Sequence, residues 1–471
     1  MRSRSFIAVV IALGIFGCTV GPNYKRPNVD VPTTYRAAPA NAAGTDASST
    51  LGAVGALGDA KWFTVFQDEQ LQNLIRAALQ QNFDLRIAAT RVLQAEAQLG
   101  ITRADQFPTL SGGAGIGTSR QAATVLFHGF EETTGQISLS ASWEIDFWGK
   151  YRRATEAARA NLLASEWGRR AVVDTVISNV ATAYFDLRAL DLQLEISKQT
   201  LASRQDSLKL EQALEQNGST SLVDVRQSEQ LVYTASETIP NVERQIEQNE
   251  NLINILLGRN PGPVERGRKL TEQPHPPSIP PGLPSSLLER RPDIQQAEAQ
   301  LIAANAEIGV AKAAYYPDIS LTGNAGYQAL ALSKLFMGQS AFWTVGPTLT
   351  VPIFTAGKIH SNVKLTEAQQ QQALLTYQQT IQQAFRDVSD SLIAYQKNRE
   401  FREQQELLTA SAEDSAKLAK IRYDAGVTSY LEVLTNDTNY FAAQLNLAQA
   451  QQNELTALVE VYNALGGGWV Q

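Results

Sequence analysis

The feature that most constrains this 471-residue chain is an internal repeat. Short motifs recur at an offset of 208 or 209 residues, in these pairs: Asp84 with Asp293, Pro108 with Pro317, Gly149-Lys150 with Gly357-Lys358, Gly218 with Gly426, and Leu257-Gly258 with Leu465-Gly466. An offset kept over so long a stretch indicates two copies of one structural unit. The copies cover residues 61–259 and 292–471, and a proline-rich linker, residues 260–291, is expected to contain no helix.

Each copy has the same predicted order of elements: helix, strand, strand, long helix, tight turn, long helix. The first long helix is predicted from Lys150 to about Asn217, because an apolar residue stands at every seventh position: Val173, Val180, Leu187, Leu194, Leu201 and Leu208. This spacing predicts a seam buried against a neighbouring helix in a left-handed supercoil. The counterpart runs from about Lys358 to Asp424. At about 1.5 Å per residue, each helix would be on the order of 100 Å long, which indicates a rod or the wall of a tube.

Four strands are predicted, at about residues 110–119, 136–146, 319–328 and 343–353. Their apolar residues alternate with serine and threonine, which is typical of a transmembrane β-barrel, although a half-buried sheet of a soluble protein alternates as well. Four strands cannot close a barrel, and unpaired edges in lipid are costly, so further copies of the chain must complete it. Three copies would supply twelve strands and leave an open bore, whereas the eight strands of two copies would be filled by side chains.

The N-terminus resembles a targeting segment. Arg2 and Arg4 precede an apolar stretch that is too short to span a bilayer, so residues 1–17 are predicted to be a signal peptide. The sequence around Cys18 resembles a bacterial lipobox, although Phe16 is bulkier than that motif usually has. Cys18 would then begin the mature protein and carry acyl chains, and residues 18–60 would form a lipid-anchored extended segment. The alternative is an ordinary signal peptide with an incidental cysteine.

Composition and motif content exclude several function classes. Charged residues make up 18% of the chain and its formal net charge is −7, which argues against nucleic acid as a partner. The three histidines show no metal-ligand spacing. No nucleophile elbow, metal motif or acid–base pair outside the helix tips suggests an enzyme, so we expect neither catalysis nor a cofactor.

Three motifs carry a resemblance to a known family: Cys18–Pro27, Leu287–Ile294, and Arg422–Gly426 followed by Leu431–Leu434. On these motifs the chain resembles the TolC-like outer-membrane efflux factors, and specifically their lipidated NodT/OprM-like group. The resemblance implies a mainly α-helical homotrimer in the outer membrane, with a twelve-stranded barrel continuous with a periplasmic helical tunnel. It also implies partners: a periplasmic adaptor and an inner-membrane RND-type pump that together expel drugs or other small molecules.

The two helix–turn–helix tips are expected to lie at the end of the tube far from the strands and to act as its gate. Carboxylates recur there in register, Asp224 with Glu432 and Glu229 with Asp437, and the first pair would place six acidic groups around the aperture of a trimer. Such a ring would favour cations, whereas the alternative is that these are solvated acids favoured by the helix dipole. Further gate residues are predicted to be Leu222 and Leu431, as an apolar constriction, and Tyr423. The adaptor is expected to contact the turn residues Gly218, Ser219, Gly426, Val427, Thr428 and Ser429.

The favoured hypothesis is a passive trimeric conduit that opens when an adaptor binds. One alternative of the same class is a duct for type I protein or polysaccharide secretion. An alternative of another class is a structural coiled-coil lipoprotein that spaces two membranes, but a spacer has no need of the duplicated strand pairs.

Overall fold

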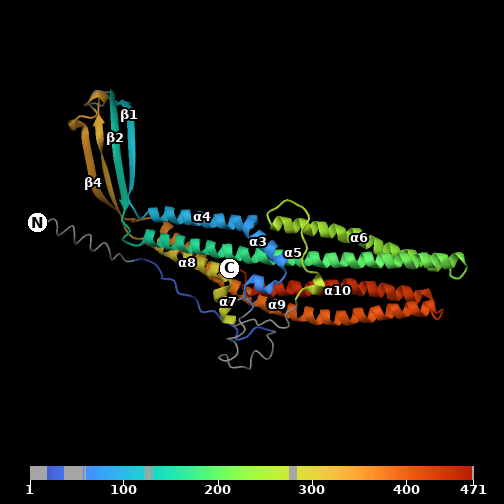
Figure 1. Cartoon of the computed structure of the whole chain (residues 1–471). Helices are drawn as coiled ribbons and strands as arrows, with labels where there is room; N and C mark the ends of the chain where they lie inside the picture. The colour runs from blue at the N-terminus through green and yellow to red at the C-terminus, as the bar shows by residue number, and fades with distance from the viewer. Residues whose placement is uncertain are drawn as a thin grey trace. The chain divides into compact units, whose positions relative to one another are not determined.

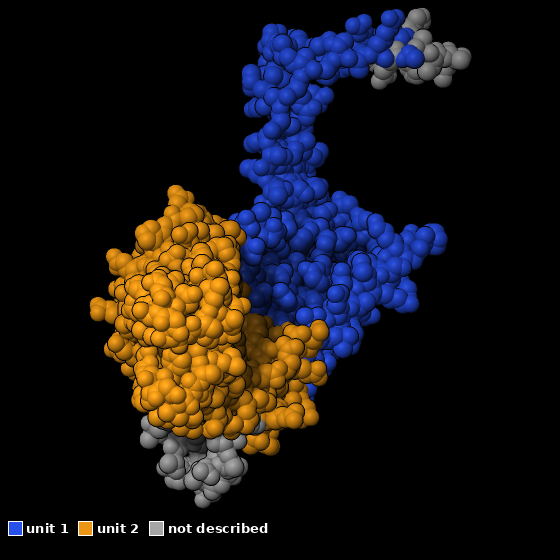
Figure 2. All heavy atoms as spheres, turned by 90° about the vertical axis from the view of Figure 1, so that its right-hand side faces the viewer, with its two compact units in different colours: residues 1–28, 91–166, 296–378 blue, residues 29–90, 167–295, 379–471 orange. Residues whose placement is uncertain are grey.

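The computed structural model describes residues 19–36, 57, 60–120, 122, 129, 131–274 and 284–468. The chain divides into two compact units, coloured separately in Figure 2. Unit 1 comprises residues 1–28, 91–166 and 296–378, and unit 2 comprises residues 29–90, 167–295 and 379–471. Each unit therefore takes segments from both copies of the repeat, so a sequence repeat and a compact unit are different divisions of this chain.

The two copies contain matching elements (Figure 1). After the short helix α2 (Trp62–Val65), the first copy contains α3 (Glu69–Gln81), α4 (Phe83–Ala104), β1 (Thr109–Arg120), β2 (Glu131–Glu144), α5 (Lys150–Gln216) and α6 (Leu222–Leu256). The second contains α8 (Pro292–Ala313), β3 (Asp318–Ala329), β4 (Ala341–Thr350), α9 (Lys358–Asp424) and α10 (Tyr430–Ala464), and α7 (Pro284–Arg290) precedes it in the linker. Helices α5 and α9 are each 67 residues long, and α6 and α10 are each 35 residues long. The mainly helical fold with a small strand part is confirmed.

Two details of the predicted elements were wrong. The linker contains the 3-10 turn η4 (Leu270–Glu272) and helix α7, because a proline is tolerated at the first position of a helix and the residues after Pro284 include good helix formers. Strands β2 and β4 begin and end earlier than predicted. The chain turns after Glu144, where the Phe147 amide donates to the Ile145 carbonyl, and Pro352 cannot donate to a ladder beyond Thr350.

In unit 1 the strands form one antiparallel sheet of order β1-β2-β3-β4, in which the β2–β3 pairing joins the two copies. The register gathers most apolar side chains of the four strands on one face, with Phe342 as an exception: Leu110, Ala114, Ile116, Ile137, Leu139, Trp143, Leu321, Tyr327, Trp343, Val345 and Leu349. The opposite face carries mainly serine, threonine, glutamine and glycine. Most of the large apolar side chains are exposed in the single chain, so this face requires an apolar environment that one copy does not provide.

The N-terminal segment packs against the helices of unit 1. The Val20 amide donates to the Trp148 carbonyl at 3.0 Å, and the Asn305 side chain donates to the Pro22 carbonyl at 2.9 Å. Close approach requires glycine at position 309, where an added Cβ would lie 2.8 Å from the Val20 carbonyl oxygen. Under this segment α5 and α8 meet through small residues, namely Ala157, Ala160, Ala303 and Ala306. These contacts position the start of the described chain beside the junction of β2 and α5.

A large hydrophobic core lies in unit 2 and is built from α2, α3, α5, α6, α10 and the linker. The predicted heptad row of α5 contributes Val180 and Leu187, which are fully buried, whereas its other members are half-buried. In α10, four residues at the same seven-residue spacing are buried: Phe441, Ala448, Leu455 and Tyr462. No helix among the residues that the structure describes is both long and apolar enough to cross a membrane.

A buried carboxylate, Asp68, fastens the linker to this core. It caps α3 and accepts hydrogen bonds from Tyr184 Oη at 2.8 Å, Gln273 Nε2 at 2.8 Å and the Arg268 amide at 2.9 Å. Burial by itself would raise the pKa of Asp68, but the hydrogen bonds outweigh it and lower the pKa below its usual value. Asp68 therefore favours the folded state only while it is ionised.

We expect Asp68→Ala to lower the free energy of unfolding by about 3 kcal/mol, because it leaves several buried donors unpaired and removes a helix cap. Because the folded-state pKa is depressed, the contribution of Asp68 is present above the unfolded pKa of about 4 and is lost as pH falls through the folded value. Denaturant unfolding at pH 7 and below pH 4 measures both effects. Asp206→Ala, at an exposed carboxylate of α5 paired only with Lys209, is the control and should change stability by less than about 0.5 kcal/mol. Equal losses in both variants would contradict this role.

Candidate functional site

The two helix–turn–helix tips of unit 2 have the same local geometry. Gly218 and Gly426 both adopt a φ of 71°, the left-handed conformation that ends a helix and that glycine adopts at little cost. In the first tip the Ser219 amide donates to the Leu214 carbonyl at 2.9 Å, and in the second the Val427 amide donates to the Arg422 carbonyl at 2.9 Å. Each long helix is thereby stopped by the same turn before the next helix begins.

The carboxylates that were predicted to recur in register, Asp224 and Glu432, occupy equivalent positions in the first turns of α6 and α10. Asp224 forms a capping box with Ser221 and accepts a hydrogen bond from Thr220 Oγ1 at 2.8 Å. The hydrogen bond from the Ser221 hydroxyl is the main reason that the pKa of Asp224 is lowered. In the second tip Thr428 Oγ1 donates to Glu432 Oε2. Arg422 lies 3.5 Å from the same carboxylate, so each acid is fixed beside its turn by contacts within its own hairpin.

The other predicted gate residues differ in their surroundings. Leu222 and Leu431, in the first turns of their helices, are both more than half exposed. Glu229 forms an exposed ion pair with Arg226 at 2.6 Å, one turn along α6. The predicted adaptor-contacting residues Gly218, Ser219, Gly426, Val427 and Ser429 are exposed, whereas Thr428 is half-buried. The predicted lipidation site, Cys18, lies outside the described residues.

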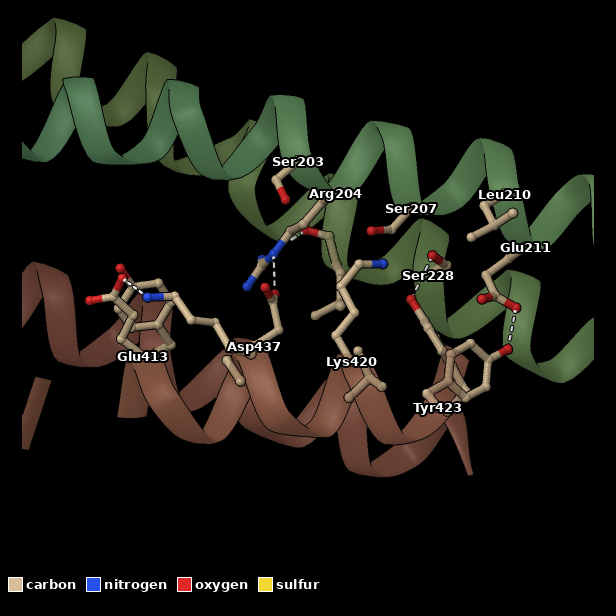
Figure 3. A pocket seen from close by; sticks show the side chains of 16 residues that line it. Ser203, Arg204, Ser207, Leu210, Glu211, Ser228, Glu413, Lys420, Tyr423 and Asp437 are labelled. Atoms are coloured by element: carbon tan, nitrogen blue, oxygen red, sulfur yellow. Dashed lines mark hydrogen bonds and ion pairs between the residues drawn. The ribbon is translucent and has the colours of Figure 1, made fainter. Parts of the chain in front are cut away.

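Asp437 forms a link between the two hairpins that sequence reasoning did not predict. Its carboxylate accepts a hydrogen bond from Arg204 Nε at 2.8 Å, so α10 is joined to α5 (Figure 3). The Arg204 side chain is only 3% exposed and also donates to the Leu231 carbonyl of α6 at 3.0 Å. The guanidinium further lies 4.9 Å from the centre of the Phe441 ring. One arginine therefore ties three helices together behind the tips.

Tyr423 forms a second link between the hairpins, closer to the turns. Its hydroxyl donates to Glu211 Oε2 of α5 at 3.0 Å, and its ring lies 5.4 Å from that of Tyr430 (Figure 3). The Tyr430 hydroxyl in turn lies 2.8 Å from Ser228 Oγ of α6. Burial raises the pKa of Glu211, and burial together with the hydrogen bond to Glu211 raises the pKa of Tyr423 to about 12. Tyr423 therefore stays protonated and able to donate at any ordinary pH.

Four residues of these links were missed from the sequence: Arg204, Glu211, Ser228 and Tyr430. A usable signal existed for two of them, because Arg204 and Glu211 are seven residues apart and so share one face of α5. Polar residues kept at heptad spacing can mark an interhelical contact as well as a solvated face. Their partners on the second hairpin are distant in sequence, so only the folded chain pairs them.

Comparisons with known proteins agree with this architecture. The chain matches the family described as outer membrane efflux protein over residues 74–259 and 283–467. It is 37% identical to the solvent efflux pump outer membrane protein SrpC of Pseudomonas putida, over 96% of each chain. It is 35% identical to the probable outer membrane lipoprotein SilC of Salmonella typhimurium, over 97% of this chain and 96% of that protein.

A solved structure gives the same result. The open state of the Neisseria gonorrhoeae MtrE outer membrane channel superposes with a TM-score of 0.84 at 30% sequence identity, over 96% of this chain and 99% of that one. The likeness covers both hairpins and the strands, because almost the whole chain is aligned. The chain therefore belongs to the outer membrane efflux protein family and is an outer-membrane component of an efflux system.

Proposed function

We propose that this protein is the exit duct of a tripartite efflux pump, which conducts drugs or other small molecules passively out of the cell. Three copies would close a twelve-stranded transmembrane barrel continuous with a helical tunnel. The observation that carries the proposal is the sheet of unit 1, whose apolar face is exposed and whose outer strands β1 and β4 each pair with one neighbour among the described residues. Unpaired strand edges are not stable in lipid, so a membrane-spanning sheet of this kind has to be closed by further copies.

We place the lipid anchor at Cys18, immediately before the described segment. The hydrogen bond between the Val20 amide and the Trp148 carbonyl supports this, because it holds the next residues at the end of β2. Trp148 also stacks on Tyr316 at 4.6 Å, and aromatic pairs of this kind favour the interface between lipid and water. An acyl chain on Cys18 would thus enter the membrane beside the strands.

We assign the gate to the two tips and the adaptor contact to their exposed turns. The supporting observation is the shared geometry of the two tips within one chain: the same turn, the same threonine-to-acid hydrogen bond, and an exposed leucine in the first turn of the second helix, although Leu222 and Leu431 stand one position apart in register. In a trimer, Asp224 and Glu432 would contribute carboxylates of both hairpins to one aperture. Binding of a periplasmic adaptor linked to an inner-membrane pump of the RND type would open it by shifting a closed–open equilibrium.

The purified, membrane-reconstituted protein should form heat-modifiable trimers that conduct ions across planar bilayers with a preference for cations. We expect Asp224→Asn combined with Glu432→Gln to reduce that preference, because the acidic ring favours cations. Reversal potentials in a salt gradient measure the change, and Asp206→Asn, an exposed acid away from the turns, is the control. The proposal that the protein is a conduit would be contradicted if the parent protein stayed monomeric and neither it nor the two variants conducted ions.

A further inference from the structure

A polar cavity of about 220 Å³ lies in unit 2 between the two helical hairpins, behind the tip turns (Figure 3). Its wall combines residues of α5, α6, α9 and α10, so anything bound in it would touch both hairpins. The groups that matter for its chemistry are Ser203, Arg204, Ser207 and Glu211 of α5, Glu413, Lys417 and Lys420 of α9, and Asp437 of α10.

Every carboxylate that lines this cavity already has a partner. Asp437 accepts from Arg204 at 2.8 Å, Glu413 pairs with Lys417 at 2.6 Å, and Glu211 accepts from Tyr423 at 3.0 Å. Within the described chain, therefore, the acidic groups of the cavity do not require a bound cation.

The donors of the cavity are not matched in the same way. Arg204 Nη2 is buried without a hydrogen-bond partner, in a side chain that is 97% buried. An unpaired buried donor is costly, and a guanidinium edge suits the oxygen of a phosphate or carboxylate. Figure 3 shows the Lys420 amino group reaching from α9 toward α5, and the carboxylate of Asp424 lies 4.0 Å from it. The hydroxyls of Ser203 and Ser207 add two more donors on the wall.

We propose that this cavity binds a small oxyanion, with phosphate or carboxylate oxygens accepting from Arg204 and Lys420. The ligand would supply the acceptor that Arg204 Nη2 lacks and would also accept from Lys420, so that donors of both hairpins would meet on one anion. It would also bridge α5 to α9, beside the links made by Asp437 and Tyr423. If the tips are the gate, as proposed above, the bound oxyanion stabilises their closed packing.

The binding step is tested by titrating inorganic phosphate, and in a second arm acetate, into the full-length trimer in nanodiscs by calorimetry at constant ionic strength. We expect saturable binding of phosphate, of acetate or of both, which identifies the preferred oxyanion. Lys420→Gln should weaken it about tenfold or more, since it removes a charge-assisted hydrogen bond. Lys209→Gln, an exposed lysine of α5 paired with Asp206 and not lining the cavity, should leave the affinity unchanged. Ser207→Ala should also weaken oxyanion binding, but by less, because it removes an uncharged donor.

Absence of saturable binding for both anions, or equal affinity in Lys420→Gln and the parent protein, would overturn the proposal. The effect on the gate is measured separately, as the open probability in planar bilayers with and without the bound oxyanion. If the oxyanion binds but does not change the open probability, the binding site is confirmed and the proposed effect on the gate is refuted. Loss of conductance in the parent protein itself would instead count against the proposed conduit, so the two failures are distinguishable.

Discussion

Replacing Gly326 with valine is expected to prevent the protein from assembling into a conducting oligomer. A Cβ at this position of β3 would lie 2.1 Å from the Ile137 carbonyl oxygen and 2.7 Å from Ser138 Cα of β2. Both are backbone atoms, so no side chain can move aside to relieve the clash. The variant must separate β2 from β3, and this pairing is the one that joins the two copies of the repeat within the sheet.

The expected loss exceeds the cost of ordinary overpacking, about 1–3 kcal/mol, because a ladder between two backbones is broken rather than a core rearranged. Heat-modifiable oligomers on gels and conductance in planar bilayers measure the outcome. Gly346→Val is the matched control: it lies on the same face of the neighbouring strand β4, where an added Cβ meets nothing within 4 Å. If Gly326→Val formed conducting oligomers, or if both variants lost assembly to the same extent, the described backbone contact between β2 and β3 would be contradicted.

The second large effect is expected at the link between the hairpins. Arg204→Met should raise the open probability of the reconstituted channel, because it removes the hydrogen bonds that tie α5 to Asp437 of α10 and to the Leu231 carbonyl of α6. Hydrogen bonds to charged groups contribute about 1.5–3 kcal/mol, which corresponds to a shift of about tenfold or more in the closed–open equilibrium. Methionine keeps much of the buried stem volume, so the variant tests the charge rather than the packing.

A double-mutant cycle makes this prediction specific. Asp437→Asn should also raise the open probability, and the double variant should add little to either single change, because both residues act through one contact. Arg226→Met is the control, since Arg226 is exposed and its ion pair in the described part of the chain is with Glu229 of its own helix. Strictly additive effects of Arg204→Met and Asp437→Asn, or an equal effect of the control, would show that the ion pair does not hold the tips.

Much of the fold follows from local patterns in the sequence. The heptad spacing in α5 and the alternation in β2 are local properties. The first predicted a helix and the second a strand, and the structure has both. The offset of the repeat placed Gly218 and Gly426 at equivalent turns, and both adopt the same left-handed conformation. Errors occurred where local preferences are weak or opposed, as in α7, where Pro284 begins a helix in a segment predicted to contain none.

The candidate site was predictable only in part. The acids at positions 224 and 432 are visible in the sequence because each stands at the start of a helix, and helix starts have a recognisable pattern. Asp437, which was predicted as a gate acid, lies in a contact between the two hairpins. Its partner, Arg204, lies 233 positions away along the chain, and no local pattern specifies such a pairing.

The sequence by itself determined the duplication, the elements of each copy and the positions of the turns, because these depend on the spacing of residues close together in the chain. Only the tertiary structure decided which residues of one hairpin meet those of the other. It also revealed that all four strands share one apolar face, since the pairing register sets the side on which each residue of a strand lies. The unmatched donors between the hairpins likewise became visible only in the folded chain, because an orphaned group is defined by what surrounds it in space.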